Sequence, residues 1–311
     1  MQDRPYFTFV PAGPRTTTAL HRIVIVGGGA GGLELAVRLG EKLKHKRKAE
    51  IVLIDPLLTH VWKPLLHEVA AGTLLTADAG LDFLQQAKRH HFRFHLGAMA
   101  SLDRKRKEIG LSPLHDELGN EIAPQRSLWY DTLVIAIGSR DNDFGIPGVK
   151  EHCVPLNGPD DAQHFHRRLL ALFARAEMLN RGPVRVVIVG GGATGVELAA
   201  ELLDSTRIIA SYGAHLQQYP SAIRICLVDS AARLLSALPE HLGQQSARDL
   251  AERGVEIRLQ QKVIGIDPHR VILSDGKKQH IVSSDITVWA AGIRCPDMLA
   301  GIDGLESNRL N

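Results

Sequence analysis

The sequence predicts an α/β protein of two domains that share one plan, each a parallel β-sheet covered by helices. The first observation is that residues 184–201 have the pattern of a buried β-branched strand, a glycine-rich turn and a helix. Residues 23–39 repeat this pattern in the first half of the chain. The second observation is that residues 131–138 match residues 285–292, and each segment has the pattern of a strand running into a turn of small residues. Two copies at this separation indicate two similar domains rather than one elaborated domain.

The glycines of both turns have the spacing of a dinucleotide-binding fingerprint. In such a turn the first glycine lets the chain reverse, the second lets the backbone approach a pyrophosphate, and the third lets the helix pack on the sheet. The N-terminal N–H groups of the helix then point at the pyrophosphate. The predicted pyrophosphate-binding glycines are Gly27, Gly29 and Gly32 in the first copy and Gly190, Gly192 and Gly195 in the second. The sequence therefore predicts two Rossmann-like dinucleotide-binding domains.

Each copy continues into a second strand that ends in an acid, Asp55 in the first and Asp229 in the second. A carboxylate at this position can accept hydrogen bonds from an adenosine ribose. The later strand of the first copy ends in Gly138, where the turn is expected to pass close to a bound nucleotide. Asp229 also predicts a preference for NADH over NADPH, because it would repel a 2′-phosphate. Arg233 is a contrary indication, since an arginine nearby could pair with that phosphate.

Composition and cysteine spacing exclude several other classes of protein. A net charge of +3 over 311 residues gives no reason to expect a nucleic-acid partner. The three cysteines, at positions 153, 226 and 295, are far apart, which argues against a redox-active dithiol and a zinc site. His67 and Glu68 could begin an H-E-x-x-H zinc motif, but Ala71 replaces the second histidine. We therefore expect no metal site, and no apolar run approaches the ~20 residues of a membrane span.

Turn-rich segments divide the chain into four predicted parts. These are a flexible leader at 1–21, a first domain at 22–147, a second domain at 148–293 and a return toward the first domain at 294–311. We expect residues 93–130 and 254–275 to form small antiparallel meanders, and residues 160–180 to form a helix.

At this level of detail the chain resembles the bacterial type II NADH:quinone oxidoreductases. These are single-subunit, non-proton-pumping NADH dehydrogenases of the pyridine nucleotide-disulfide oxidoreductase superfamily. The resemblance extends over residues 22–311, and the segment Lys-Pro-Leu-Leu-His-Glu is its most specific part. The matching stretches are residues 23–34, 62–70, 130–134, 188–197, 289–293 and 304–306.

The resemblance implies a glutathione-reductase-like two-domain flavoprotein with FAD in the first domain and NADH in the second. The two glycine sets would then hold the FAD and NADH pyrophosphates, and Asp55 and Asp229 would hold the riboses. The segment Lys63, Pro64 and Leu65 would lie near the isoalloxazine, and Ala291 and Gly292 would line the nicotinamide side. Hydride would pass from NADH to the flavin, and the reduced flavin would reduce a membrane quinone.

Glu197 matches a family carboxylate proposed to sit by the flavin and the quinone, which makes it the candidate catalytic residue. The alternative is a structural role, because a glutamate in the first turn of a helix is favoured by the helix dipole.

In this family the later part of the FAD domain follows the NADH domain. It supplies an Ala-x-Gly-Asp motif, quinone-site residues and amphipathic membrane helices, and this sequence contains none of them. We therefore expect a C-terminally truncated chain whose first domain is incomplete. The full-length form is expected to lie at the cytoplasmic face of the bacterial inner membrane in peripheral contact with it, and to be able to form a homodimer. The chain as given is expected to be soluble in the cytoplasm.

Two alternative functions remain open from the sequence. The chain could be another flavin-dependent NADH reductase of the same superfamily, although a disulfide reductase would need a cysteine pair where this chain has residues 60–67. It could also be a catalytically incompetent NADH-binding fragment.

Overall fold

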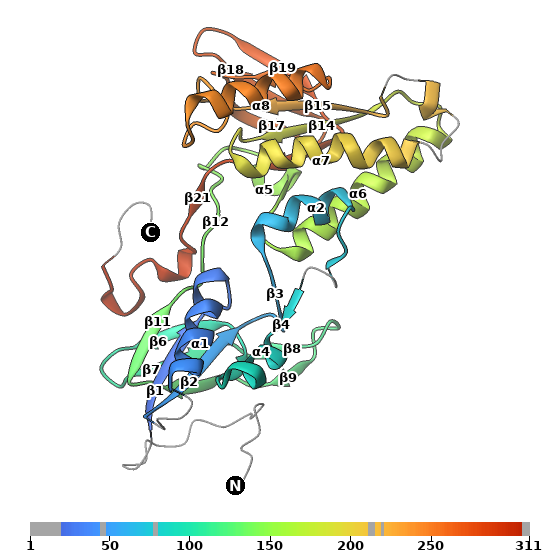
Figure 1. The fold of residues 1–311 in the computed structure, drawn as a ribbon. Coiled ribbons are helices and arrows are strands. Elements are labelled where there is room, and N and C mark those ends of the chain that lie inside the picture. Colours follow the sequence, from blue (N-terminus) through green and yellow to red (C-terminus); the bar gives the residue numbers. More distant parts are fainter. Residues whose placement is uncertain (1–19, 44–47, 77–79, 211–214, 219–220, 307–311) are drawn as a thin grey trace. The chain divides into compact units, whose positions relative to one another are not determined.

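The computed structural model describes residues 20–43, 48–76, 80–210, 215–218 and 221–306 (Figure 1). The chain divides into two compact units. Unit 1 contains Met1–Trp62, Gly80–Ser139 and Arg294–Asn311, and unit 2 contains Lys63–Ala79 and Arg140–Ile293. The predicted leader at 1–21 falls, up to residue 19, outside the described residues.

Unit 1 is built on a four-stranded parallel sheet in the order β11-β1-β2-β5. Its strands are β1 (His21–Val26), β2 (Ala49–Asp55), β5 (Arg93–Leu96) and β11 (Thr132–Ile135). Alternate residues of these strands face two cores, as the period of two in a strand requires. On one face Ile25 and Leu53 pack with side chains of α1 (Ala30–Leu43) and α4 (Phe83–His90). On the other face Val24 and Ile54 pack with an antiparallel sheet of β6 (Met99–Asp103), β7 (Glu108–Leu111) and β10 (Arg126–Trp129).

The last segment of unit 1 returns to this second core. It begins with β21 (Ile293–Arg294) and continues into the short 3-10 helices η3 (Asp297–Leu299) and η4 (Ile302–Gly304). Leu299 and Ile302 pack against the core. The Asp303 carboxylate accepts from the backbone N–H of Arg104 at 2.8 Å and from its Nε at 2.9 Å. Two small two-stranded antiparallel sheets complete the unit, one of β3 (Thr59–Val61) with β4 (Gly80–Asp82) and one of β8 (Leu114–His115) with β9 (Glu121–Ala123).

Unit 2 repeats the plan with a five-stranded parallel sheet in the order β13-β20-β14-β15-β16. Its strands are β13 (Cys153–Pro155), β14 (Val184–Val189), β15 (Ile223–Val228), β16 (Glu256–Arg258) and β20 (Ile286–Trp289). The antiparallel sheet consists of β17 (Lys262–Asp267), β18 (Arg270–Ser274) and β19 (Gln279–Ser283). The helices are α5 (Val149–His152), α6 (Pro159–Met178), α7 (Ala193–Ala210) and α8 (Glu240–Glu252), and the short elements are β12 (Arg140–Asp141) and η2 (Leu216–Gln218).

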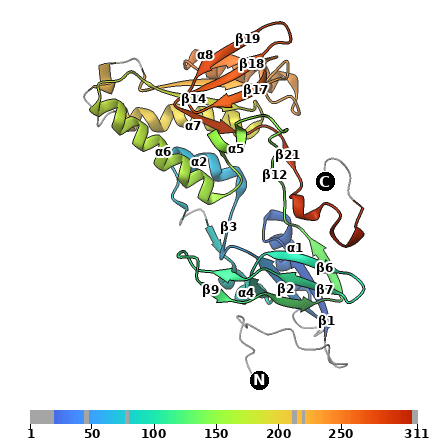
Figure 2. The same cartoon turned by 180° about the vertical axis from the view of Figure 1, so that it is seen from behind.

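The segment that carries the family motif belongs by its contacts to unit 2. It forms η1 (Lys63–Leu65) and α2 (Leu66–Ala71), and α2 packs on α6 and α7, beside which it lies in both views (Figure 1, Figure 2). The Thr73 hydroxyl donates to the Glu201 carboxylate of α7 at 2.6 Å. The predicted domain ranges, 22–147 and 148–293, therefore differ from the observed units in this segment, and also in the position of the later boundary, which falls at 139/140.

Both expected meanders begin later in the chain than predicted. Residues 93–96 and 256–258 are parallel strands of the main sheets, paired with β2 and β15, so the antiparallel parts start at 99 and 262. The physical reason is that α4 and α8 precede these strands, and a helical crossover returns the chain parallel to the strand it left. Among the described residues, no helix combines the length and apolar character needed to cross a membrane.

Candidate dinucleotide-binding sites

The first glycine of each turn reverses the chain against the neighbouring strand. Gly27 and Gly190 have φ angles of +105° and +118°, which L-residues with side chains rarely adopt. A Cβ on Gly27 would lie 2.4 Å from the Ala136 carbonyl oxygen, and one on Gly190 would lie 2.5 Å from that of Ala290. Both positions therefore need glycine, because the backbone has a positive φ angle and because a side chain would collide with a carbonyl oxygen.

The second and third glycines have opposite surroundings in each turn. An added Cβ on Gly29 or Gly192 would meet nothing within 4 Å, so these backbones face open space that a phosphate group could enter. A Cβ on Gly32 would lie 1.8 Å from the Gly27 carbonyl oxygen, and one on Gly195 would lie 1.9 Å from that of Gly190. The fingerprint predicts that the second glycine leaves room for a phosphate and that the third lets the helix pack closely, and the space around these glycines agrees with both roles.

The acids that end β2 and β15 hold the glycine turns through backbone N–H groups. Asp55 accepts from Gly28 at 2.6 Å and from Leu57 at 2.9 Å, through different carboxylate oxygens. Asp229 likewise accepts from Gly191 through one oxygen and from Ala231 at 2.6 Å through the other. Each oxygen keeps a further lone pair for a ribose hydroxyl. Burial raises the pKa of Asp55, against the lowering effect of the Leu57 and Gly28 N–H groups.

Arg233, the residue that could have favoured NADPH by pairing with its 2′-phosphate, forms hydrogen bonds within its own loop. Its guanidinium donates to the carbonyl oxygens of Leu235 at 3.0 Å, Ser236 at 2.7 Å and Leu238 at 2.9 Å. Because three carbonyls hold it, pairing with a 2′-phosphate would require breaking these bonds. The geometry thus favours Asp229 as the residue that sets nucleotide preference.

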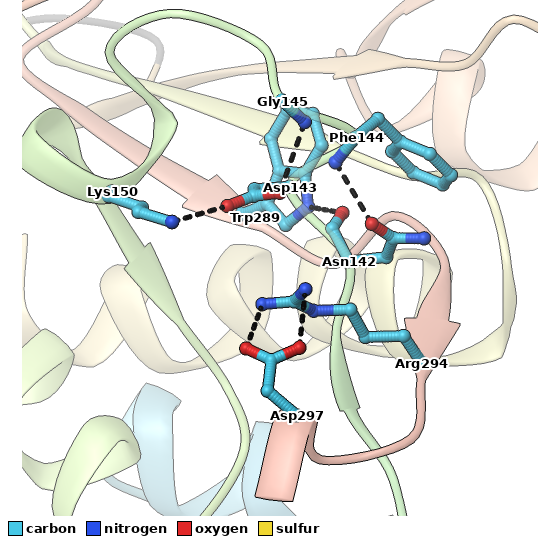
Figure 3. A network of polar contacts seen from close by, with 8 residues as sticks. All are labelled: Asn142, Asp143, Phe144, Gly145, Lys150, Trp289, Arg294 and Asp297. Atoms are coloured by element: carbon cyan, nitrogen blue, oxygen red, sulfur yellow. Dashed lines mark hydrogen bonds and ion pairs between the residues drawn. The ribbon is translucent and has the colours of Figure 1, made fainter. Parts of the chain in front are cut away.

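The end of β20 is braced by the loop that follows β12 (Figure 3). The Trp289 indole N–H donates to the Asn142 carbonyl oxygen at 2.8 Å, and the Asn142 side-chain oxygen accepts from the Phe144 N–H at 3.0 Å. This holds Phe144 at φ +50°, with its ring 2.4 Å from where a Cβ of Gly292 would lie. Phe144 is 58% exposed, so an aromatic ring that sequence analysis missed lies beside the predicted nicotinamide turn, Ala291–Gly292.

The same loop is fixed further along by charged groups. Asp143 accepts from the Gly145 N–H at 3.1 Å and pairs with Lys150 at 3.2 Å (Figure 3).

Arg294 and Asp297 form an i,i+3 pair with bonds of 2.9 and 3.2 Å at the start of the return segment. Gly138, the first-unit counterpart of Gly292, also has a positive φ, of +72°, and an added Cβ there would meet nothing within 4 Å.

Lys63 lies in a partly buried acidic environment that contains Asp141. Burial lowers the pKa of Lys63, while the Asp141 charge acts to raise it. Burial also raises the pKa of Asp141 to about 6, and the nearby Asp161 adds to this rise. The backbone N–H of Asp141 donates to the Asn157 side-chain oxygen at 2.8 Å, and the Asp141 carboxylate accepts from the Leu156 N–H at 3.3 Å. Asp141 is a titratable site residue that sequence analysis missed, because no motif marks it.

Glu197 lies beyond the first turn of its helix, which corrects the structural alternative given for it. Helix α7 begins at Ala193, and its first turn contains no acid. Since the dipole effect falls off within that turn, it does not account for this glutamate. Its carboxylate instead lies 3.6 Å from the His67 ring nitrogen of α2, with the Glu197 side chain 48% exposed. Pro64 and Leu65, the other predicted flavin-contact residues, lie with Lys63 in η1, directly before α2.

The cysteines do not form a dithiol. All three are free, and burial raises the pKa of both Cys153 and Cys226 to about 12. A thiol with such a pKa is a poor nucleophile at neutral pH. This argues against the disulfide-reductase alternative.

Comparison with known proteins identifies the family. The family model described as pyridine nucleotide-disulphide oxidoreductase matches residues 21–311. A type II NADH:quinone oxidoreductase of Haemophilus influenzae is 37% identical over 308 residues, which cover 94% of this chain and 68% of that protein. NdhA, a type II NADH:quinone oxidoreductase of Mycobacterium tuberculosis, is 31% identical over 95% of this chain and 62% of its own length.

A solved structure supports the same fold. NDH2 of Plasmodium falciparum in complex with NADH superimposes with a TM-score of 0.79 at 21% identity, covering 90% of this chain and 57% of that one. The chain thus spans a little over half to about two thirds of the length of these relatives.

These matches, together with the two glycine turns and their carboxylates, confirm the predicted family, fold class and enzyme class. The chain belongs to the type II NADH:quinone oxidoreductases, within the pyridine nucleotide-disulphide oxidoreductase family.

Proposed function

We propose that this protein oxidises NADH and passes the electrons through FAD to a quinone. The observation that carries the proposal is the pair of similar glycine turns, one in each unit. In each turn the second glycine faces open space, and the acid at the end of the next strand accepts a hydrogen bond from the turn. FAD, when bound, would supply the hydride acceptor and the reductant of the quinone. Gly27, Gly29, Gly32, Asp55 and Gly138 would hold it in unit 1.

Unit 2 would bind NADH through its glycine turn, with Asp229 on the ribose and Ala291 and Gly292 beside the nicotinamide. We expect calorimetric titration of the purified chain to give tighter binding of NADH than of NADPH. Asp229→Asn removes the negative charge and leaves one side-chain oxygen, so one of the Gly191 and Ala231 N–H groups keeps its acceptor. The variant should therefore bind NADPH about tenfold more tightly than the parent, consistent with ~1.4 kcal/mol of charge repulsion. Tighter NADPH than NADH binding by the parent would contradict the assignment.

FAD binding by unit 1 has a separate readout. We expect the protein at the length of its relatives, after incubation with FAD and gel filtration, to retain a flavin absorbance band in proportion to protein. Gly29→Val should reduce that band while leaving NADH binding by unit 2 unchanged. An undiminished band in Gly29→Val would show that the flavin is not held at this turn.

We further propose that Glu197 acts in the electron transfer to quinone, with His67 holding its position. The support is the 3.6 Å approach of His67, a residue of the Lys-Pro-Leu-Leu-His-Glu segment, together with the half-exposed carboxylate. In the FAD-loaded protein, Glu197→Gln should slow flavin reoxidation by quinone and leave NADH affinity unchanged. Glu201→Gln is the matched control, because Glu201 lies one turn further along α7 and bonds Thr73. Equal reoxidation rates in the two variants would leave Glu197 without this role.

Peripheral contact with the cytoplasmic face of the inner membrane and homodimer formation complete the proposal. Flotation with lipid vesicles would test the first, and light scattering after gel filtration would test the second.

A further inference from the structure

Unit 2 has a cavity at the edge of its sheet opposite to the glycine turn. Its volume is 620 Å³, and it is lined at the amino ends of β14, β15 and β20, whereas Gly190 and Asp229 lie at the carboxyl ends of β14 and β15. The lining is mainly basic. Its charged and titratable members are Arg175, Arg181, Arg185, Arg224, His269 and Asp285.

Among the described residues, one of the four arginines that line this cavity has an acidic partner. Arg185 and Asp285 form a two-pronged pair, with bonds of 2.8 and 3.0 Å, and Asp285 also accepts from the Arg185 backbone N–H at 2.9 Å. Within the part of the chain that the structure describes, the guanidinium groups of Arg175, Arg181 and Arg224 have no carboxylate within ion-pair distance. Positive charge therefore exceeds negative charge around the cavity.

Unit 1 has a carboxylate at the corresponding position of its own sheet. There Arg22 is the second residue of β1, as Arg185 is of β14, and the Asp131 carboxylate accepts from its backbone N–H at 2.8 Å, as Asp285 does from Arg185. In register, Arg22 stands opposite Glu50 on the next strand. Glu50 accepts from Arg22 at 2.7 Å and from Arg93 at 2.8 Å, so one carboxylate compensates two guanidinium groups.

Unit 2 has an arginine where unit 1 has this glutamate. Arg185 stands opposite Arg224 in the register of β14 and β15. The nearest acid on the following strand, Glu256, pairs with Arg258 at 2.6 Å and does not line the cavity. The repeat therefore places two arginines side by side: Asp285 compensates Arg185, and Arg224 has no carboxylate partner among the described residues.

We propose that this cavity is a binding site for a phosphate group, with Arg175, Arg181 and Arg224 as its ligands. Arginine binds phosphate oxygens through paired N–H donors, and a phosphate brings more negative charge than a single carboxylate. The cavity is larger than one phosphate, so it can also contain part of the molecule that carries the group. That molecule is either a soluble phosphorylated metabolite or a phospholipid headgroup.

Calorimetric titration of the 311-residue chain with pyrophosphate tests the site, with NADH present at saturation to block the glycine turn of unit 2. Arg224→Glu places a carboxylate opposite Arg185, as Glu50 stands opposite Arg22 in unit 1, and should weaken pyrophosphate binding at least tenfold. Arg175→Gln should weaken it about tenfold through loss of one charged donor. Arg167→Glu is the matched control, since Arg167 is exposed on the same helix as Arg175, lies outside the lining and gives the same change of net charge as Arg224→Glu. It should stay within about twofold of the parent.

A second arm distinguishes the two sources of phosphate. The chain is floated with vesicles of phosphatidylcholine alone or with added phosphatidic acid. Flotation that needs phosphatidic acid and is lost in Arg224→Glu assigns the site to a headgroup, and pyrophosphate binding without such flotation assigns it to a soluble ligand. Thermal unfolding checks that each variant is folded. The proposal is overturned if the parent binds in neither arm, or if Arg224→Glu and Arg175→Gln both bind as the parent does.

Discussion

Replacing Gly195 by alanine tests whether close helix packing is the reason for the third glycine of the fingerprint. The added Cβ would lie 1.9 Å from the Gly190 carbonyl oxygen and 3.3 Å from the Ile188 side chain, whereas ordinary van der Waals contact begins near 3.4 Å. The start of α7 must therefore move away from β14 by more than an ångström. We expect this overpacking to cost about 3 kcal/mol. Alanine recovers about 1 kcal/mol through its higher helix propensity, so the net loss is about 2 kcal/mol.

The assay is thermal unfolding of the parent, Gly195→Ala and Gly192→Ala in the absence of nucleotide. A net loss of 2 kcal/mol lowers Tm by roughly 4–8 °C for a domain of this size. Gly192→Ala is the control, because its Cβ meets nothing within 4 Å, and it should stay within ~1 kcal/mol of the parent while weakening NADH binding. The reasoning is refuted if the two variants have the same Tm, or if Gly192→Ala is the less stable one.

Three further predictions concern charge and thiol chemistry. Burial raises the pKa of Asp141 to about 6 in the folded state, above its unfolded value, so the folded state binds more protons between pH ~4 and 6 and loses stability as pH rises through that window. Urea unfolding should therefore show that Asp141→Asn is more stable than the parent at pH 7.5, and that this difference vanishes near pH 4. Because burial raises the pKa of Cys153 and Cys226 to about 12, mass spectrometry should find at most one iodoacetamide adduct on the folded chain at pH 8, and three after unfolding. Arg22→Ala should cost ~2 kcal/mol in urea unfolding, because its ion pair is 16% and 14% exposed, whereas Arg185→Ala, from a pair 46% and 26% exposed, should cost under ~1 kcal/mol. Equal losses in the two arginine variants would contradict the link to burial.

The local features of both glycine turns could be predicted from the sequence because each depends on a short stretch of residues. A glycine that must avoid a neighbouring carbonyl group, or an acid at the end of a buried strand, recurs at a fixed spacing that the sequence shows directly. The strands Val184–Val189 and Ile223–Val228 lie where the sequence predicts a strand before the glycine turn and a strand before Asp229, since each ends in four successive apolar residues.

Features that depend on packing between distant segments could not be predicted in this way. Whether residues 63–79 pack with unit 1 or unit 2 depends on the surfaces of α6 and α7, which no local pattern encodes. The raised pKa of Asp141 comes from burial in the folded chain. The pairing of Arg185 with Arg224 could be recognised only when strand register aligned the two copies residue by residue.

The bond between Arg104 and Asp303 has a consequence for the order in which the protein folds during synthesis. These residues belong to unit 1 but are separated by 199 positions, and the residues between them include the whole sheet of unit 2. The parallel sheet of unit 2 can therefore assemble while the second core of unit 1 still lacks Leu299 and Ile302. We therefore expect unit 1, although its first strand leaves the ribosome earliest, to be the later of the two to finish folding. For a time the nascent chain would present a completed nucleotide-binding turn at Gly190 while the second core of unit 1 is still open to water.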